Sequence, residues 1–144
     1  MTDKNLLVIT PHRKEPGKQR IAAYCRVSSR SDEQLNSLTN QINFYRSLFE
    51  NDDTVVFVGI YAEEGLSGTQ AESRPQFMKM IEDCRSGLID CIRTKSVSRF
   101  GRNTVDTLIY TRELRSLGID VFFEKENIHS TESSGELMLT LMAA

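Results

Sequence analysis

The chain has 144 residues, of which 39% are hydrophobic and 26% are charged, and this balance is typical of one soluble globular domain with a single core. Its net charge of −2 argues against a free-standing nucleic-acid-binding module, because such modules usually carry a basic excess. Any nucleic acid would have to be held by something other than the overall charge of this chain.

Membrane and secretory segments are not expected. The longest apolar runs cover residues 6–9 and 54–61, far short of the roughly 20 residues that span a bilayer, and no secretory signal is present. The cysteines, Cys25, Cys84 and Cys91, are odd in number and lack CxxC spacing. This usage favours buried thiols in a reducing compartment, so a cytoplasmic protein is expected.

The first third of the chain predicts an arm, a strand and a helix. Residues 1–19 combine prolines with a basic cluster, which is typical of an N-terminal arm. An apolar run predicts a strand over 20–27. Helical spacing of apolar residues follows over 32–50, where Ser31 and Gln34 have the form of a capping box.

The middle third continues the alternation of strands and helices. A β-branched and aromatic run predicts a largely buried second strand over 54–61. The stretch 62–75 is long and rich in turn residues, which is typical of a functional loop. Pro75 then opens a helix that Gly87 closes, and a third strand is expected over 88–92.

The last third predicts two helices around a fourth strand. Thr104 is a candidate cap for the first helix, and Gly118 ends it. The strand is expected over 119–123 and a loop over 124–133, before a final helix that begins near Gly135 and is cut off by the end of the chain. The apolar positions of the two helices are Val105, Leu108, Ile109 and Leu117, then Leu137, Met138, Leu141 and Met142.

This order predicts an α/β fold: a three-layer, mostly parallel sheet of four to five strands with helices on both faces. One domain over 20–144 follows the arm. Sites in such folds form at the carboxyl ends of strands. The loops after the first three strands should therefore meet at one edge of the sheet.

Two basic segments point to phosphate chemistry. Arginines flank Ser28 on both sides, and no carboxylate occurs until Asp32, so the local field suits an anion. The run 93–103 also carries four positive charges and no negative one. Since Ser28 directly follows a buried strand, it is the candidate nucleophile, and the two segments are expected to converge on one phosphodiester.

Four motifs occur in order: Tyr24-Cys25-Arg26-Val27-Ser28-Ser29, Ser37-Leu38-Thr39-Asn40-Gln41, Glu64-Gly65-Leu66-Ser67-Gly68-Thr69 with Arg74-Pro75, and Lys95-Ser96-Val97-Ser98-Arg99-Phe100-Gly101-Arg102-Asn103. Together they resemble the catalytic domain of serine recombinases, the resolvases and invertases, over residues 20–144. Arg-x-Ser alone would be nearly worthless, whereas four motifs in sequence are specific. The Tyr-Cys-Arg-Val-Ser form, and Ser98 where small resolvases usually carry an acid, look more like the large serine recombinases and transposases of mobile elements.

The resemblance implies a site-specific recombinase or transposase in which Ser28 attacks DNA, leaving a 5′-phosphoserine link and a free 3′-hydroxyl. The residues that it implies for the phosphate clamp are Arg26, Arg74, Arg99 and Arg102, with Ser67 and Gln41 in positioning roles. Guanidinium forks stabilise phosphoryl-transfer charge without a metal, so no cofactor is expected. The general base stays open, because neither His12 nor His129 lies near a motif.

The same resemblance implies DNA as partner, bound through regions outside this chain, and a homo-oligomer that is a dimer or a synaptic tetramer. In the family the final helix continues, carries the main subunit contacts and leads to DNA-binding domains. Residues 1–144 alone are therefore expected to fold without recombining DNA, with the apolar side chains of the last helix partly exposed.

Several positions admit a second interpretation. Arg74 suits a solvated helix start equally well, and Arg99 and Arg102, three residues apart, suit one solvated helix face. Asp90 is either a strand end or a partner that orients an arginine. Arg93 stands where an apolar strand residue is expected, and a buried guanidinium without a partner would be costly.

Two alternatives exist for the function as a whole. The first is a catalytically inactive relative that uses the fold for protein contacts and oligomerisation, which a covalent protein–DNA adduct would exclude. The second is a phosphatase or hydrolase. It is disfavoured because Cys25 and Arg30 have four intervening residues where the cysteine-phosphatase loop has five, and no nucleophile-elbow or P-loop motif occurs.

Overall fold

A computed structural model describes residues 16–28, 31–64 and 74–144. The elements in chain order are β1 Gln19–Arg26, α1 Asp32–Phe49, β2 Val55–Glu63, α2 Pro75–Arg85, β3 Cys91–Thr94, α3 Val97–Phe100, α4 Thr104–Ser116, β4 Asp120–Phe123, β5 Ile128–His129 and α5 Ser133–Ala143. One five-stranded sheet has the order β2-β1-β3-β4-β5. Its first four strands are parallel and β5 is antiparallel to β4, so the predicted α/β class is confirmed.

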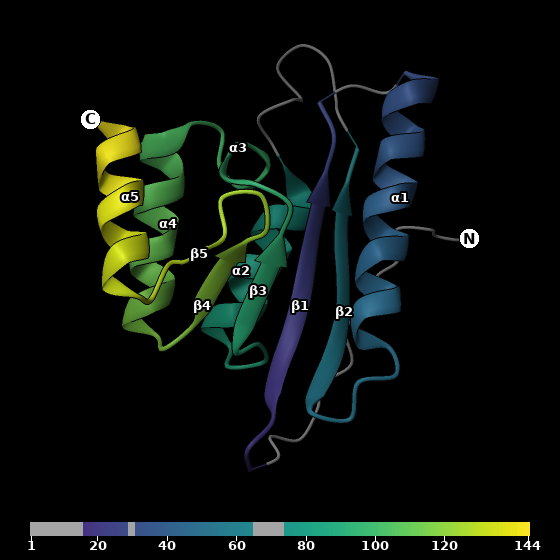
Figure 1. The fold of residues 1–144 in the computed structure, drawn as a ribbon, viewed down its shortest axis with the longest axis horizontal. Helices are drawn as coiled ribbons and strands as arrows, with labels where there is room; N and C mark the ends of the chain where they lie inside the picture. Colours follow the sequence, from purple (N-terminus) through teal and green to yellow (C-terminus); the bar gives the residue numbers. More distant parts are fainter. Residues whose placement is uncertain (1–15, 29–30, 65–73) are drawn as a thin grey trace.

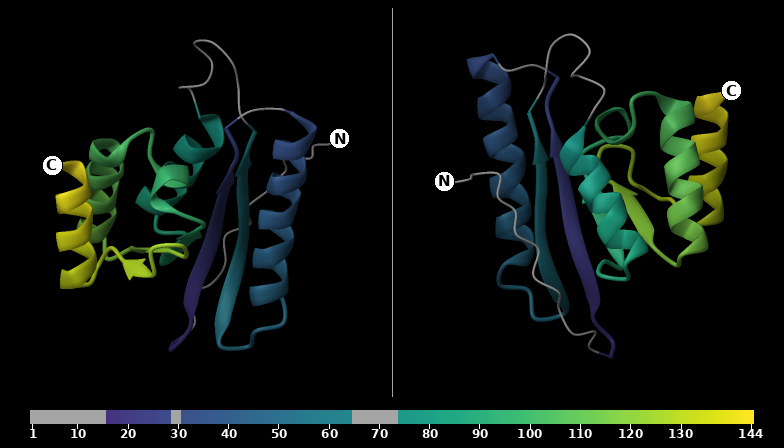
Figure 2. Two further views of the ribbon diagram at one scale, coloured as in Figure 1. Left: turned by 45° about the horizontal axis from the view of Figure 1, so that its top comes forward. Right: turned by 180° about the vertical axis from the view of Figure 1, so that it is seen from behind.

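Helices cover both faces of the sheet (Figures 1 and 2). α1 packs against β1 and β2 on one face, while α2 packs against β2 on the other. α4 and α5 lie side by side at the β4–β5 end of the sheet. The interior strand β1 therefore has helical cover on both sides, which accounts for its uninterrupted apolar run.

Two apolar cores lie on opposite faces of β1, because alternate residues of a strand point to opposite sides. Tyr24 belongs to the core under α2, where its ring meets that of Phe77 edge-on, with 5.4 Å between the ring centroids. Cys25 belongs to the core under α1, together with Tyr45. Burial raises the pKa of the Cys25 thiol to about 12, as expected for an inert structural cysteine.

Local signals fix the helix ends. Ser31 caps α1 by accepting a hydrogen bond from the Gln34 backbone N–H at 3.2 Å. The Gln34 side chain does not complete the expected box, because its Oε1 accepts from the backbone N–H of Ser28 at 3.4 Å. Gly87 and Gly118 both follow their helices with φ near +80°, a conformation that favours glycine, and so end α2 and α4 as predicted.

The third strand was misplaced by about three residues: it covers Cys91–Thr94 rather than 88–92. Leu88 is needed to close α2, because its N–H donates to the Asp83 carbonyl at 3.0 Å. Thr94 extends the strand instead, since its hydroxyl donates to the Tyr24 carbonyl at 2.9 Å. The second strand also reaches further than expected, to Glu63.

The last third holds further corrections. The short helix α3 and strand β5 were not predicted, and α5 begins two residues earlier than expected. The cap of α4 is Asn103, whose side chain accepts from the Asp106 N–H at 2.8 Å, and not Thr104. The apolar residues that predicted α4 are mostly outside the core, whereas its buried positions are Asp106, Thr107, Thr111 and Leu114.

Ion pairs in the structure decide between the two interpretations that the sequence allowed for Asp90 and for Arg93. Asp90 orients an arginine, because its carboxylate accepts from Arg20 Nε and Nη2, each at 3.1 Å. Arg93 is partly buried but paired, with Nη2 2.8 Å from the Glu124 carboxylate and its guanidinium over the Phe122 ring at 4.4 Å. The doubt about an unpaired charge in β3 is removed.

The predicted arm, 1–19, lies largely outside the described residues, although Gln19 already belongs to β1. Among the helices that the structure describes, none is long and apolar enough to cross a membrane. As expected, four apolar side chains of α5 are exposed, although Leu139 is buried: Leu137, Met138, Leu141 and Met142.

Candidate active site

The strand order changes direction at the carboxyl end of β1. From β1 the chain runs through α1 to β2 on one side, and β3 then returns to the other side of β1 after α2 has crossed the opposite face. Such a change of direction leaves an opening beyond the strand ends, where α/β proteins bind ligands. Ser28 follows β1 at this edge, and residues 96–102, here called the arginine segment, follow β3.

Ser28 is exposed at the edge, two residues after the last residue of β1. The residue before it, Val27, is buried, and its N–H donates to the Glu63 carbonyl at 3.4 Å. The chain therefore leaves the sheet immediately before Ser28. The Ser28 hydroxyl therefore lies just beyond the end of a rigid strand, and a nucleophile requires such a fixed position.

Arg26 joins the two segments. Its Nε donates to the Arg99 carbonyl at 3.0 Å and its Nη2 to the Ser98 carbonyl at 2.8 Å. Burial lowers the pKa of the Arg26 guanidinium, and the charges of Arg74 and Arg99 act in the same direction. Arg26 thus lies close enough to Arg74 and Arg99 for both charges to act on it, which is the electrostatic setting for an anion.

The arginine segment presents two further guanidinium groups. Arg99 is partly buried on α3, and Arg102 lies beyond α3 with 49% of its side chain exposed, so the two do not share one helix face. A Cβ at Gly101 would overlap Thr107, so the segment packs directly on α4. Within the described residues, no carboxylate forms an ion pair with Arg26 or Arg99.

Arg74 lies beneath the segment and is 5% exposed, so its interpretation as a solvated helix-start residue is wrong. Its guanidinium donates to the Phe100 carbonyl, lies 3.5 Å from the Asp106 carboxylate and sits 3.8 Å from the Phe77 ring centroid. Its backbone adopts φ of +43°, which L side chains rarely do. The fold thus holds Arg74 firmly under the backbone that carries Arg99.

Glu63 is a site residue that sequence reasoning missed. Its carboxylate accepts from the Tyr24 hydroxyl at 2.9 Å and from the N–H groups of Gln76 and Phe77, each at 3.0 Å. It therefore caps α2 from β2, which suits a helix whose own N-cap residue, Arg74, makes no side-chain cap. Burial, followed by the Glu63 charge, raises the pKa of Tyr24.

Asp106 was missed as well. Its carboxylate accepts from the Arg102 N–H at 3.0 Å and from Arg102 Nη2 at 3.2 Å, in addition to the ion pair with Arg74. The spacing Asn103-x-x-Asp106 at a helix start was the available signal for this residue. For Glu63 the signal was an acid placed directly after an apolar strand.

Gln41 holds Arg26 from the other face of the sheet. It is buried on α1, where its Oε1 accepts from the Arg26 N–H at 3.3 Å and its Nε2 donates to the Arg26 carbonyl at 3.2 Å. Beside it, α1 lines an open pocket of about 570 Å³ that Lys95 and Glu124 border. Gln41 positions the strand end rather than facing the arginines.

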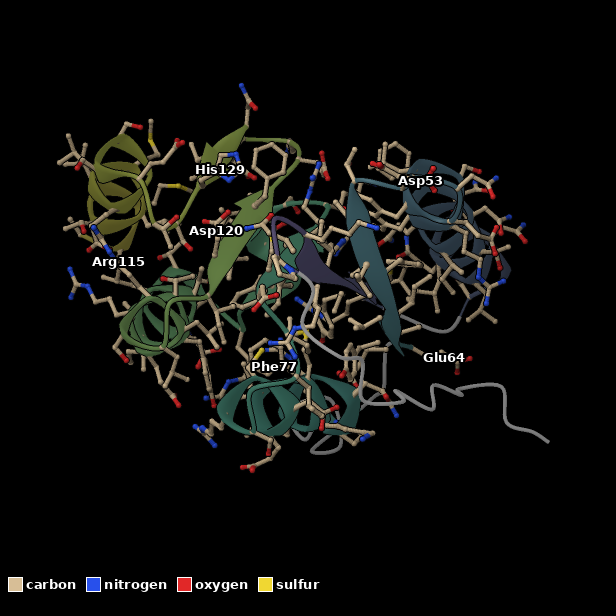
Figure 3. All side chains as sticks on the ribbon, turned by 90° about the horizontal axis from the view of Figure 1, so that it is seen from below. Asp53, Glu64, Phe77, Arg115, Asp120 and His129 are labelled. Atoms are coloured by element: carbon tan, nitrogen blue, oxygen red, sulfur yellow. The ribbon has the colours of Figure 1, made fainter. Side chains whose placement is uncertain are left out.

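One predicted site residue, Ser67, and the histidine His129, which lies far from the motifs in sequence, remain. Ser67 lies outside the described residues. His129 pairs through Nδ1 with Asp120 at 2.6 Å, near the amino end of β4 (Figure 3). The sheet register places Asp120 level with Ile21, which at about 3.3 Å per residue is roughly 20 Å from Ser28 along β1.

Comparisons with known proteins agree with this architecture. The family model "Resolvase, N terminal domain" matches residues 21–144. A resolvase family site-specific recombinase from Streptococcus pneumoniae is 28% identical, with a TM-score of 0.72 over 88% of this chain and 84% of that one. The N-terminal catalytic domain of TP901-1 integrase is 26% identical, with a TM-score of 0.61 over 87% and 92%.

A more distant structure shares the fold. The C-terminal catalytic domain of ISC1926 TnpA, an IS607-like serine recombinase, is 18% identical, with a TM-score of 0.59 over 73% of this chain and 68% of that one. A comparison with curated protein sequences finds no match.

Proposed function

Because the chain belongs to the resolvase family, as a catalytic domain of the serine site-specific recombinases, we propose that Ser28 attacks a DNA phosphodiester and becomes linked to its 5′-phosphate. The Ser28 Oγ–phosphorus bond forms as the bond from phosphorus to the 3′ oxygen breaks. The serine hydroxyl loses its proton and the 3′ oxygen gains one. Attack by a 3′-hydroxyl on the phosphoserine reverses the step and rejoins DNA without ATP, because the number of phosphoester bonds is unchanged.

One observation carries the proposal: the exposed Ser28 lies two residues after Arg26, and no carboxylate of the described residues forms an ion pair with Arg26 or Arg99. Arg26 donates to main-chain carbonyls rather than to a carboxylate, and Arg99 stands beside it. A phosphate bridging these groups would supply the missing negative charge. Preorganised donors of this kind stabilise the charge that develops on the equatorial oxygens in phosphoryl transfer.

The remaining residues have distinct proposed roles. Arg102, half exposed at the end of the arginine segment, would donate to the phosphate from the rim. Arg74 would add its charge from beneath, next to the carbonyl of Phe100. Gln41 would fix the strand end that carries Arg26. Ser67, in the loop after β2, would assist in orienting the DNA backbone.

The family acts on DNA, and the proposed assembly is a dimer that pairs with another into a synaptic tetramer. The net charge of −2 supports a division of labour in which other regions supply most of the DNA affinity. Exposed apolar side chains on α5, such as Leu137 and Leu141, support a subunit contact through that helix.

Ser28→Ala tests the proposal. In the full-length protein, wild type incubated with a plasmid carrying its recombination sites should give a protein–DNA adduct that survives denaturing electrophoresis. Ser28→Ala should fold normally, bind DNA with similar affinity and give no adduct. An adduct that persists in the alanine variant would assign the nucleophile elsewhere, and a wild type that binds DNA without any adduct would favour an inactive, protein-binding relative.

A further inference from the structure

The arginine segment is held from outside by the turn between β4 and β5. The Glu124 N–H donates to the Thr94 carbonyl at 2.9 Å, and the Lys125 N–H donates to the Lys95 carbonyl at 2.8 Å. These bonds continue the β3–β4 pairing beyond the ends of both strands. The turn therefore lies alongside the backbone that leads into α3.

Glu126 extends from this turn to the start of α3. Its Oε1 accepts from the backbone N–H of Val97 at 3.1 Å. The helix provides no cap of its own, because the Ser96 hydroxyl pairs with that of Ser98 at 3.1 Å. Val97 is 3% exposed, so without Glu126 its N–H would lack an acceptor among these contacts and have little access to water.

A four-residue helix has little stability of its own, so its position depends on such external contacts. That position matters for the site because the carbonyls of Ser98 and Arg99 receive Arg26, and the carbonyl of Phe100 receives Arg74. One short backbone stretch thus orients two arginines through its carbonyls and carries a third as its own side chain.

We propose that Glu126 is a positioning residue for phosphoryl transfer: by accepting from the Val97 N–H it fixes the arginine segment against Arg26 and Arg74. This role rests on the proposed function of Ser28 and the arginines. It requires a hydrogen-bond acceptor at the position of Oε1, whereas the negative charge of the carboxylate is not needed. Glutamine can therefore replace Glu126, and alanine cannot.

The test compares Glu126→Ala and Glu126→Gln in the full-length protein. The covalent adduct is followed in a single turnover with saturating protein on a plasmid carrying the recombination sites, and DNA affinity is measured separately by gel shift. Glu126→Ala should slow adduct formation on the order of 10- to 100-fold, with affinity within about twofold of wild type, since small misplacements of reacting groups cost rate rather than binding. Glu126→Gln should restore most of the rate.

Glu132 provides the matched control. It is an exposed acid six residues further on, and it makes no side-chain cap to α5. Glu132→Ala removes the same charge and should leave rate and affinity unchanged. Equal losses in the alanine and glutamine variants of Glu126, or a wild-type rate in Glu126→Ala, would overturn the proposal.

Hydrogen exchange separates this role from the chemistry. Amides of the arginine segment should exchange faster in Glu126→Ala than in wild type and Glu126→Gln, with no DNA present. If the alanine variant does not fold, Glu126→Asp, whose shorter side chain withdraws the acceptor, takes its place. If the wild type forms no adduct, the proposed function is wrong, and the exchange result still decides whether Glu126 holds the arginine segment. Exchange rates that are the same in Glu126→Ala and wild type would show that Glu126 does not hold it.

Discussion

Each end of β1 carries an arginine, and the two guanidinium groups have different kinds of partner. At the amino end, Asp90 faces Arg20 with a bidentate carboxylate and also accepts from the Arg20 backbone N–H at 2.8 Å. At the carboxyl end, within the part of the chain that the structure describes, the Arg26 guanidinium donates to two main-chain carbonyls, and the charges of Arg74 and Arg99 act on it. A carboxylate neutralises the charge where its role is structural, and the charge is left available where we propose that a phosphate arrives.

The largest expected effect is at the carboxyl end. Arg26→Ala should reduce adduct formation by about a hundredfold or more, since losing one preorganised donor typically costs on the order of 3 kcal/mol in activation free energy. The free energy of unfolding should change much less. Single-turnover cleavage and urea unfolding of the full-length protein measure both quantities.

Arg26→Lys serves as the control for charge alone. An ammonium cannot copy the planar fork that reaches two carbonyls, so little activity should return. If lysine restored the rate, position 26 would provide only a positive field. If the alanine variant were chiefly unstable, the two ends of β1 would not differ in the way described.

At the amino end the expected effect is on stability. Asp90→Ala leaves the Arg20 charge largely buried without its partner, which should lower the free energy of unfolding by about 2–3 kcal/mol. Cleavage by the folded fraction should match wild type. Urea unfolding provides the measurement.

Glu82 offers a matched exposed pair, because it lies 2.9 Å from Arg85 with 66% of its side chain accessible. Glu82→Ala should cost well under about 1 kcal/mol. An Asp90→Ala protein that was as stable as Glu82→Ala would show that the amino end does not depend on this ion pair.

A small effect is also expected at Arg93 in the middle strand β3, where one carboxylate and two aromatic rings contact the guanidinium group. Arg93→Leu should change the free energy of unfolding by less than about 1 kcal/mol, because an apolar side chain replaces a partly exposed ion pair. Thermal or urea unfolding checks this. A loss of several kcal/mol would mean that the pair with Glu124 stabilises the sheet as strongly as the pair at Arg20.

The spacing of apolar residues predicted β1, α1 and α2 well. In each of these elements the buried residues and the residues that mark its ends lie within a few positions of one another in the sequence. Apolar spacing failed as a guide where the buried side chains of a helix are polar. α4 places Asp106 and Thr107 inward, since the carboxylate is needed by Arg74 and Arg102 and the threonine packs on Gly101. Apolar spacing cannot reveal a helix face that is selected by charge partners.

The sequence by itself determined the α/β class, the strand that ends before Ser28 and the identity of the basic segments, because each depends on local pattern or on a motif read in order. Only the tertiary structure decided which groups meet: Glu63 with the start of α2, Asp106 with Arg74, Glu126 with Val97. These partners are 13 to 32 residues apart in the chain. Local propensity carries no information about contacts between residues so far apart in the sequence. The order of the strands brings these donors and acceptors together, and their burial requires them to be paired.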